Sequence, residues 1–346
     1  YAEVRALVGG VTGIQGASAA STATREPLVR NLDLWAFGAH RARAMVDLPS
    51  ASSRDMPRLR KVLADIAAGE VTAFYLHLCE GVRGDTRSAS EFTRFRDLVV
   101  ATPATNIIHG SALSADDLHE VAAAGCRLVW SPQSNLRLYG QTTLASVALD
   151  AGMPVALGAD WLPSGSTSLL AEMKVARREL ARQGRPIAAA ELVAMVTSVA
   201  ARVAGLDAQL GSLAAGRPAD LVVLERHHED PYESVALADP SWVELVCIGG
   251  DVTYGRADWF DRANLRVSTP GHEYADKYPC IWNAGQLPNQ AEYDLDFPVT
   301  ADYTVVALYT AASSRPVDIY LDGVKVHRGF AAVTGRWQTS HARWER

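Results

Sequence analysis

Over its first two hundred residues the chain alternates short apolar runs with segments of helical spacing. The apolar runs are short enough to be buried strands, and the helical segments mostly end at a glycine, as helix C-termini commonly do. We expect strands at 11–15, 72–77, 106–109, 127–130 and 155–158, and helices at 1–8, 56–69, 114–125, 142–152, 169–183 and 188–204. This alternation from residue 9 to about 205 predicts an α/β fold with parallel strands.

The pattern changes after Gly205. Residues 211–220 are rich in turn formers and lead into a strand at 221–224, and residues 243–254 predict a hairpin around Gly249 and Gly250. From about residue 270 the segments 293–297, 303–309 and 317–321 partly alternate apolar and polar residues, which predicts an antiparallel sheet fragment with a turn at Asp322-Gly323. The predicted domains are therefore 1–205, 206–265 and 270–346.

Composition and charge exclude some classes of function. The 346 residues are 48% hydrophobic, enough for a large core, and the net charge of −6 is spread without a basic stripe. We therefore expect a small-molecule substrate and neither nucleic acid nor a membrane as partner, and no apolar run reaches the roughly 18 residues of a membrane helix. The four cysteines lie far apart and form no CxxC pair, so neither a cysteine metal site nor a disulfide framework is indicated.

Polar residues stand where three of the apolar runs end. His77 and Glu80 follow one run, His109 ends the next, and Asp160 follows a third. Intervals of 32 and 51 residues correspond to about one and two strand-plus-helix units, so parallel strands would bring these side chains to one rim. Imidazole and carboxylate groups in this arrangement are typical of a hydrolytic zinc site.

Each of these residues also has an ordinary structural explanation when it is taken alone. His77 would be a buried histidine bonded to backbone beside a surface Glu80, His109 a satisfied core histidine, and Asp160 the N-cap of the next helix. The metal-site hypothesis depends on the joint pattern, because four unrelated explanations would all have to fall at strand ends in order.

The strand-end segments resemble those of a known family. Residues 77–80 (His-Leu-Cys-Glu), 109–110 (His-Gly), 131–136 (Ser-Pro-Gln-Ser-Asn-Leu) and 158–160 (Gly-Ala-Asp) are similar to the fifth to eighth strand-end motifs of the amidohydrolase superfamily, in particular of its mononuclear metal-dependent branch. That branch includes cytosine and S-adenosylhomocysteine deaminases and triazine hydrolases. Residues 10–16 resemble an early barrel strand of the family, and 211–224 resemble its return to a small β domain.

The resemblance implies a fold, a reaction and roles for individual residues. The fold is a partial (β/α)8 barrel that lacks its first strand, followed by a small β domain, and the reaction is metal-dependent hydrolysis of a C–N bond, either deamination or cyclic amide hydrolysis. One divalent ion, zinc before iron or manganese, would be held by His77 and Asp160, with Glu80 and His109 as the catalytic pair. The loop residues Trp161, Ser164 and Ser166 are candidate substrate contacts, with ordinary loop packing as the alternative.

One family feature is missing from the sequence. The family takes two further ligands from a His-x-His at the end of the first strand, and no His-x-His occurs here; His227 and His228 are adjacent and lie beyond the barrel pattern. Residues 1–8 read as the middle of a helix and the last residues follow a strand-like stretch, so we expect a fragment whose upstream segment carries the motif. The compartment and the oligomeric state stay open.

Residues 270–346 support an alternative function. They resemble part of a carbohydrate-binding type of β-sandwich, in which Trp282, Trp337 and Trp344 would stack on sugar rings or simply form a core. Under this alternative the barrel is catalytically inactive and the sandwich fragment binds glycans.

Overall fold

The computed structural model describes residues 2–16, 28–32, 41–255, 265–268, 280–283, 304 and 306–345. The chain forms two compact units, Tyr1–Gly255 and Arg256–Arg346, and each is described by itself.

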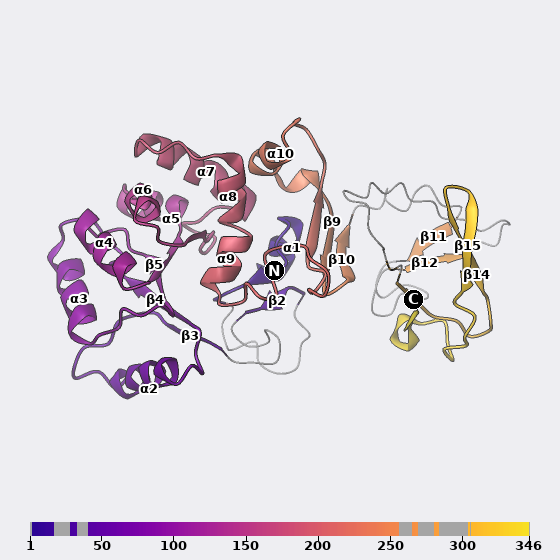
Figure 1. Cartoon of the computed structure of the whole chain (residues 1–346), viewed down its shortest axis with the longest axis horizontal. Coiled ribbons are helices and arrows are strands. Elements are labelled where there is room, and N and C mark those ends of the chain that lie inside the picture. Colours follow the sequence, from indigo (N-terminus) through magenta and orange to yellow (C-terminus); the bar gives the residue numbers. More distant parts are fainter. Residues whose placement is uncertain are drawn as a thin grey trace. The chain divides into compact units, whose positions relative to one another are not determined.

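A parallel sheet organises the first unit (Figure 1). Its strands lie in chain order and pair only in parallel: β3 (Ala42–Met45), β4 (Ala73–Leu78), β5 (Thr105–His109), β6 (Arg127–Trp130) and β7 (Val155–Leu157). Helices follow the strands: α2 (Met56–Ala67), α3 (Thr86–Asp97), α4 (Ala115–Ala123), α5 (Pro132–Tyr139), α6 (Ala145–Asp150) and α7 (Leu169–Arg182). The predicted α/β fold with parallel strands is confirmed, and all carboxyl ends of these strands lie at one edge of the sheet.

Local sequence sets several helix boundaries. The Asp85 side chain accepts a hydrogen bond from the Ser88 N–H at the start of α3, and Ser114 forms a capping box with Asp117 at the start of α4. Helix α5 ends at Gly140 in the left-handed conformation that favours glycine.

Strand β4 separates two groups of apolar side chains. Phe74 and Leu76 are fully buried in the large core under the helices, whereas Ala73 and Tyr75 pack in a smaller cluster with Val203. Because side chains alternate across a strand, His77 extends on the same face as Ala73 and Tyr75.

Two sequence predictions of helices need correction. The predicted helix 188–204 is two helices, α8 (Ala189–Ala194) and α9 (Ser198–Val203), because the backbone leaves the helical region at Thr197 (φ −129°, ψ −97°). The predicted helix 142–152 begins only at Ala145. The hydroxyls of Thr142 and Thr143 form tertiary hydrogen bonds instead, which favours non-helical backbone there.

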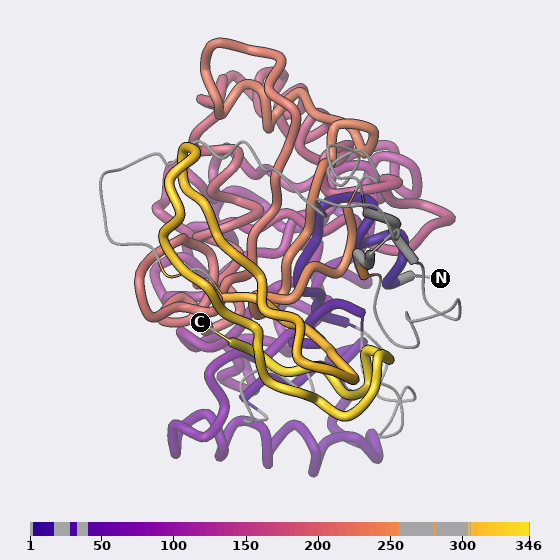
Figure 2. Tube along the Cα trace, turned by 90° about the vertical axis from the view of Figure 1, so that its right-hand side faces the viewer, coloured from indigo at the N-terminus to yellow at the C-terminus, as the bar shows by residue number. Residues whose placement is uncertain are grey.

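A second, antiparallel sheet completes the first unit. It consists of β8 (Leu221–Leu224), β9 (Val243–Ile248) and β10 (Asp251–Gly255) in the order β10-β9-β8, with α10 (Pro231–Leu237) and a 3-10 turn (Pro240–Trp242) between β8 and β9. The predicted hairpin at 243–254 is thus confirmed. Helix α1 (Ala2–Val8) lies beside this sheet in both Figure 1 and Figure 2, and β1 (Gly13–Ile14) pairs in parallel with β2 (Arg30–Asn31).

The second unit contains antiparallel strand pairs. They are β11 (Leu265–Ser268) with β12 (Cys280–Asn283), β13 (Ala307–Tyr309) with β16 (Arg343–Glu345), and β14 (Val317–Leu321) with β15 (Val324–Gly329), and a 3-10 turn covers Thr339–His341. The predicted turn at Asp322-Gly323 joins β14 to β15. The strand predicted at 293–297 lies outside the described residues. In the described parts of the chain, no helix is both long and apolar enough to cross a membrane.

Candidate metal and catalytic site

Three of the predicted site residues come together at the carboxyl ends of neighbouring strands. His77 is near the end of β4, Glu80 follows it in the turn, and His109 ends β5, where it is in register with Leu78. Each of the three offers a ligand atom, and these atoms lie within 4.8 Å of one another. The two imidazole rings have their centres 5.2 Å apart. The fourth predicted residue, Asp160, is not a member of this group.

The backbone turns sharply at each of these strand ends. Cys79, His109 and Asp160 all have positive φ (50°, 65° and 55°), a conformation that non-glycine residues rarely adopt. Ser111 connects the turns after β4 and β5, because its hydroxyl accepts a hydrogen bond from the Gly81 N–H and donates one to the Gly81 carbonyl. Such backbone strain is common at functional sites, where the surrounding structure maintains it.

His109 is buried, and both of its ring nitrogens face polar side chains. Its side chain is 2% exposed, its Nδ1 lies 3.1 Å from Asn135 Nδ2, and its Nε2 lies 3.5 Å from Glu80 Oε2. Burial lowers the pKa of His109, and the negative charges of Glu80 and Asp160 only partly oppose this effect. The imidazole is therefore neutral near pH 7.

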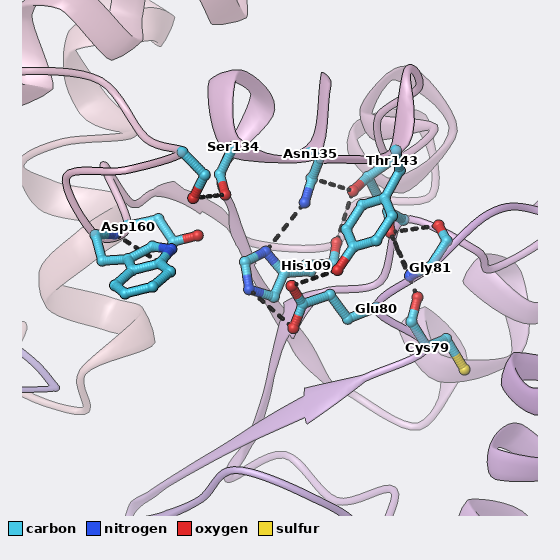
Figure 3. Close-up of polar contacts among 12 residues, drawn as sticks. Cys79, Glu80, Gly81, His109, Ser134, Asn135, Thr143 and Asp160 are labelled. Carbon is cyan, nitrogen blue, oxygen red and sulfur yellow. Dashed lines mark hydrogen bonds and ion pairs between the residues drawn. The ribbon is translucent and has the colours of Figure 1, made fainter. Parts of the chain in front are cut away.

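Glu80 is oriented from two directions. Its Oε1 accepts a hydrogen bond of 2.9 Å from the Tyr139 hydroxyl, while Oε2 faces His109 (Figure 3). Burial, together with the hydrogen bond to Glu80, raises the pKa of Tyr139 to about 12, so the phenol keeps its proton and remains a donor. Sequence reasoning missed Tyr139, although it pointed to residues 131–136 on the same helix.

His77 carries a polar atom that the described residues leave without a partner. Its Nδ1 is buried and forms no hydrogen bond in the described part of the chain. Buried polar atoms in native proteins nearly always have a partner. In addition, the two imidazoles and the carboxylate, with ligand atoms within 4.8 Å of one another, are a donor set that suits a divalent ion. These residues therefore fit a metal site.

Asp160 lies in the turn after β7. Its Oδ1 accepts a hydrogen bond of 2.8 Å from the Trp161 N–H, and Figure 3 shows Asp160 and Glu80 on either side of the His109 ring. The alternative role as N-cap of the next helix is wrong, because Ser168 caps α7 by accepting a hydrogen bond from the Ala171 N–H. The Asp160 charge is also among the causes of the pKa shifts of His109 and Tyr139.

The three candidate substrate contacts differ in exposure. Trp161 is 63% exposed beside Asp160, whereas Ser164 and Ser166 are buried. The Ser164 hydroxyl accepts a 2.8 Å hydrogen bond from the Ser134 hydroxyl. Contact within the protein therefore explains why Ser164 is buried.

The chain belongs to the amidohydrolase family. Residues 53–253, more than half of the chain, match the sequence profile of the amidohydrolase family. The predicted resemblance to the amidohydrolase superfamily is thereby confirmed, and it supports the prediction of a hydrolase that acts on C–N bonds.

Known proteins similar to this chain include deaminases and a triazine hydrolase. A 5-methylthioadenosine/S-adenosylhomocysteine deaminase of Teredinibacter turnerae is 31% identical over 165 residues, which are 45% of this chain and 37% of that protein. Among solved structures, a zinc-bound adenosine deaminase of Xanthomonas campestris has a TM-score of 0.57 at 19% identity, covering 72% of this chain and 67% of that one. The zinc-bound atrazine chlorohydrolase of Arthrobacter aurescens has a TM-score of 0.51 at 21% identity, covering 66% and 52%. The two structures show a shared fold, and the chain spans little more than a third of the curated relative.

Proposed function

We propose that this protein is a metal-dependent hydrolase that cleaves a C–N bond, as a deaminase or a cyclic amide hydrolase. The observation that carries the proposal is the convergence of His77, Glu80 and His109 within 4.8 Å at adjacent strand ends in a chain of the amidohydrolase family. In such folds the carboxyl ends of parallel strands are where catalytic residues gather. The parallel sheet β3–β7 would then be part of a (β/α)8 barrel.

His77 and Asp160 are the proposed metal ligands, and the ion is zinc before iron or manganese. The unpartnered ring nitrogen of His77 and the strand-end carboxylate of Asp160 support this choice. When bound, such an ion supplies a water molecule whose pKa is lowered towards about 7.

The proposed work of Glu80 is proton transfer. It would accept a proton from the attacking water and deliver it to the leaving nitrogen, the usual role of a carboxyl group beside such a site. The Tyr139 hydroxyl holds one carboxylate oxygen, so the other oxygen is the one presented to His109 and the reacting groups. Neutral His109 would orient the water and the substrate.

The proposed substrate is a small planar ring that carries an exocyclic nitrogen. The curated relative acts, by its name, on 5-methylthioadenosine and S-adenosylhomocysteine, and both are adenine derivatives. Exposed Trp161 beside Asp160 offers an aromatic face on which such a ring could stack. The alternative of an inactive barrel with a glycan-binding sandwich is not favoured by these relatives.

Ammonia release by the full-length protein tests the deaminase form of the proposal. S-adenosylhomocysteine, 5-methylthioadenosine, adenosine and guanine form the first set of substrates, each assayed before and after chelation and again after zinc is returned. We expect activity that chelation abolishes and zinc restores. Activity that chelation leaves unchanged would contradict the proposal.

Two matched variants test the assignment of the metal ligands. His77→Ala should lower bound zinc and activity together, because it removes a ligand. His119→Ala, which removes an exposed imidazole on α4, should change neither. Metal analysis of the purified proteins gives the answer, and full zinc content in His77→Ala would show that the ligands are misassigned.

A further inference from the structure

A buried chain of polar side chains lies behind His109. It runs from Trp130 at the end of β6, through Thr142, to Asn135 on α5, and all three side chains are almost completely buried. Asn135 lies next to His109, as Figure 3 shows. The structure gives each link of this chain a direction.

The direction starts at Trp130. An indole N–H can only donate, and it donates to the Thr142 hydroxyl over 2.8 Å. The Thr142 oxygen therefore acts as an acceptor towards Trp130, and its own proton is directed to Asn135 Oδ1 at 3.3 Å.

The neighbouring Thr143 does not supply the proton that Asn135 Oδ1 accepts. Its hydroxyl donates to the His109 carbonyl over 2.6 Å and lies 3.5 Å from Asn135 Oδ1, so the donor to this oxygen is Thr142. In the structure the amide oxygen of Asn135 faces the threonines, and its NH2 group faces His109.

The orientation of this amide determines where His109 carries its proton. An NH2 group at 3.1 Å from Nδ1 requires Nδ1 to be the acceptor, because two donors would otherwise meet. In a neutral imidazole the proton then sits on Nε2, the nitrogen 3.5 Å from Glu80 Oε2. We propose that Asn135, oriented by Thr142 and Trp130, is a positioning residue that holds His109 in the Nε2–H tautomer.

This tautomer separates the two histidines of the site. His109 presents a proton towards Glu80 and is a hydrogen-bond donor to the reacting groups, whereas the unpartnered Nδ1 of His77 marks that residue as the ligand. This role of His109 in catalysis rests on the proposed function, but the position of its proton does not.

Nuclear magnetic resonance of 15N-histidine-labelled full-length protein tests the proposal directly. Protonated and bare ring nitrogens give distinct signals, and the His109→Gln variant identifies which signals belong to His109. We expect the Nε2–H form to exceed the Nδ1–H form by about tenfold or more, with and without added zinc, because the other form leaves buried donors facing each other. A wild-type protein with the proton on Nδ1 would overturn the proposal.

Variants of Thr142 and Asn135 test whether these residues determine the tautomer of His109. Thr142→Val keeps the shape but removes the hydroxyl, so the minor Nδ1–H form should become detectable, and Thr142→Ser should restore the wild-type ratio. Asn135→Asp places an acceptor opposite Nδ1 and should move the proton there. A Thr142→Val protein with the wild-type ratio, or an Asn135→Asp protein with the proton still on Nε2, would contradict the proposed chain.

The readout is independent of turnover. If no C–N hydrolysis is found but the tautomer follows these variants, only the proposed function fails. If the protein is active and the Thr142 and Asn135 variants leave the His109 tautomer unchanged, only this inference fails.

Discussion

At the scale of single residues, the two histidines of the site differ in chemistry because their surroundings differ. His77 keeps a buried ring nitrogen without a partner among the described residues, while both ring nitrogens of His109 face polar groups. The first arrangement suits a ligand and the second suits a hydrogen-bond donor of fixed orientation. Glu80 is held by Tyr139 through one carboxylate oxygen and directs the other towards His109, as the proposed proton transfer requires.

Replacing Glu80 with Gln separates proton transfer from metal binding. The variant keeps the size and most hydrogen bonding but loses the titratable carboxyl group, so turnover should fall by roughly 100- to 10,000-fold while zinc content stays unchanged. Paired measurements of bound metal and hydrolysis rate check this. Glu70→Gln, which alters an exposed carboxyl group, is the matched control and should leave both values at the wild-type level.

A Glu80→Gln protein that loses its zinc would instead make Glu80 a ligand. The three-residue group allows that arrangement geometrically, so the measurement is decisive.

At the scale of elements, helix α5 supports the site from one side. It carries both Asn135, which contacts His109, and Tyr139, which contacts Glu80. Its first turn is held by Glu172 of α7, whose Oε1 accepts a 2.9 Å hydrogen bond from the Gln133 N–H. Helices α5 and α7 therefore act together in placing the proposed catalytic groups.

The fully buried Glu172 should make stability depend on pH. Burial raises the pKa of Glu172 above its usual value of 4.5, with hydrogen bonds such as that from Gln133 opposing the shift. The folded protein therefore retains a proton that the unfolded chain loses, and stability decreases as pH rises from about 4.5 through the folded-state pKa. Glu172→Gln does not titrate and keeps an acceptor for Gln133.

Urea unfolding at pH 4, 5.5 and 7 measures this effect. The free energy of unfolding of Glu172→Gln relative to wild type should increase with pH, whereas Glu70→Gln should show no such trend. A relative stability of Glu172→Gln that falls with pH would mean that Glu172 is stabilised as a carboxylate.

The turn after β5 depends on glycine. Gly110 has φ of 59°, and a Cβ there would meet Leu113 Cδ1 at 3.1 Å. Gly110→Ala should destabilise the protein by about 1–2 kcal/mol or more, since a left-handed conformation and crowding both cost energy.

Gly152→Ala is the control for the cost of the left-handed backbone conformation alone. Gly152 also has positive φ (74°), but a Cβ there meets nothing within 4 Å. Thermal unfolding should show a smaller loss for Gly152→Ala, and its activity should stay at the wild-type level. Equal losses of stability in both variants would indicate that crowding against Leu113 is unimportant.

At the scale of the whole molecule, one large core joins the parallel sheet β3–β7 and the antiparallel sheet β8–β10 of the first unit. Its buried residues run from Leu7 on α1 to Val246 on β9, and Tyr254 of β10 packs against it. All of these residues precede the boundary at Gly255 between the two compact units.

A chain that ends at Gly255 should therefore fold by itself. We expect a cooperative unfolding transition and the same zinc content as the full chain, because the core and the site residues are all retained. A chain that ends at Ile248 is the control, and it should be less stable because it loses β10. Loss of cooperative unfolding in the chain that ends at Gly255 would show that the second unit is needed for the first.

Much of the fold could be predicted from hydrophobic periodicity. Strands β4 to β7 and the hairpin of β9 and β10 lie within a few residues of their predicted positions, because buried strands require continuous apolar runs and tight turns require particular residues. The break between α8 and α9 was not predictable in this way, since both helices share one apolar spacing and the break depends on backbone angles at Thr197.

The amino-acid pattern alone pointed to the family that the profile match shows, and it named His77, Glu80 and His109 as candidates, which the fold brings together. This was possible because polar residues at successive strand ends leave a local signature. The pattern did not reveal Tyr139, Glu172 or the Trp130–Thr142–Asn135 chain. These residues act through hydrogen bonds between segments distant along the chain or on different elements, and such contacts exist only once α5 has packed against β5 and α7. Periodicity records which face of an element is buried, whereas the direction of a proton depends on which groups meet in the folded protein.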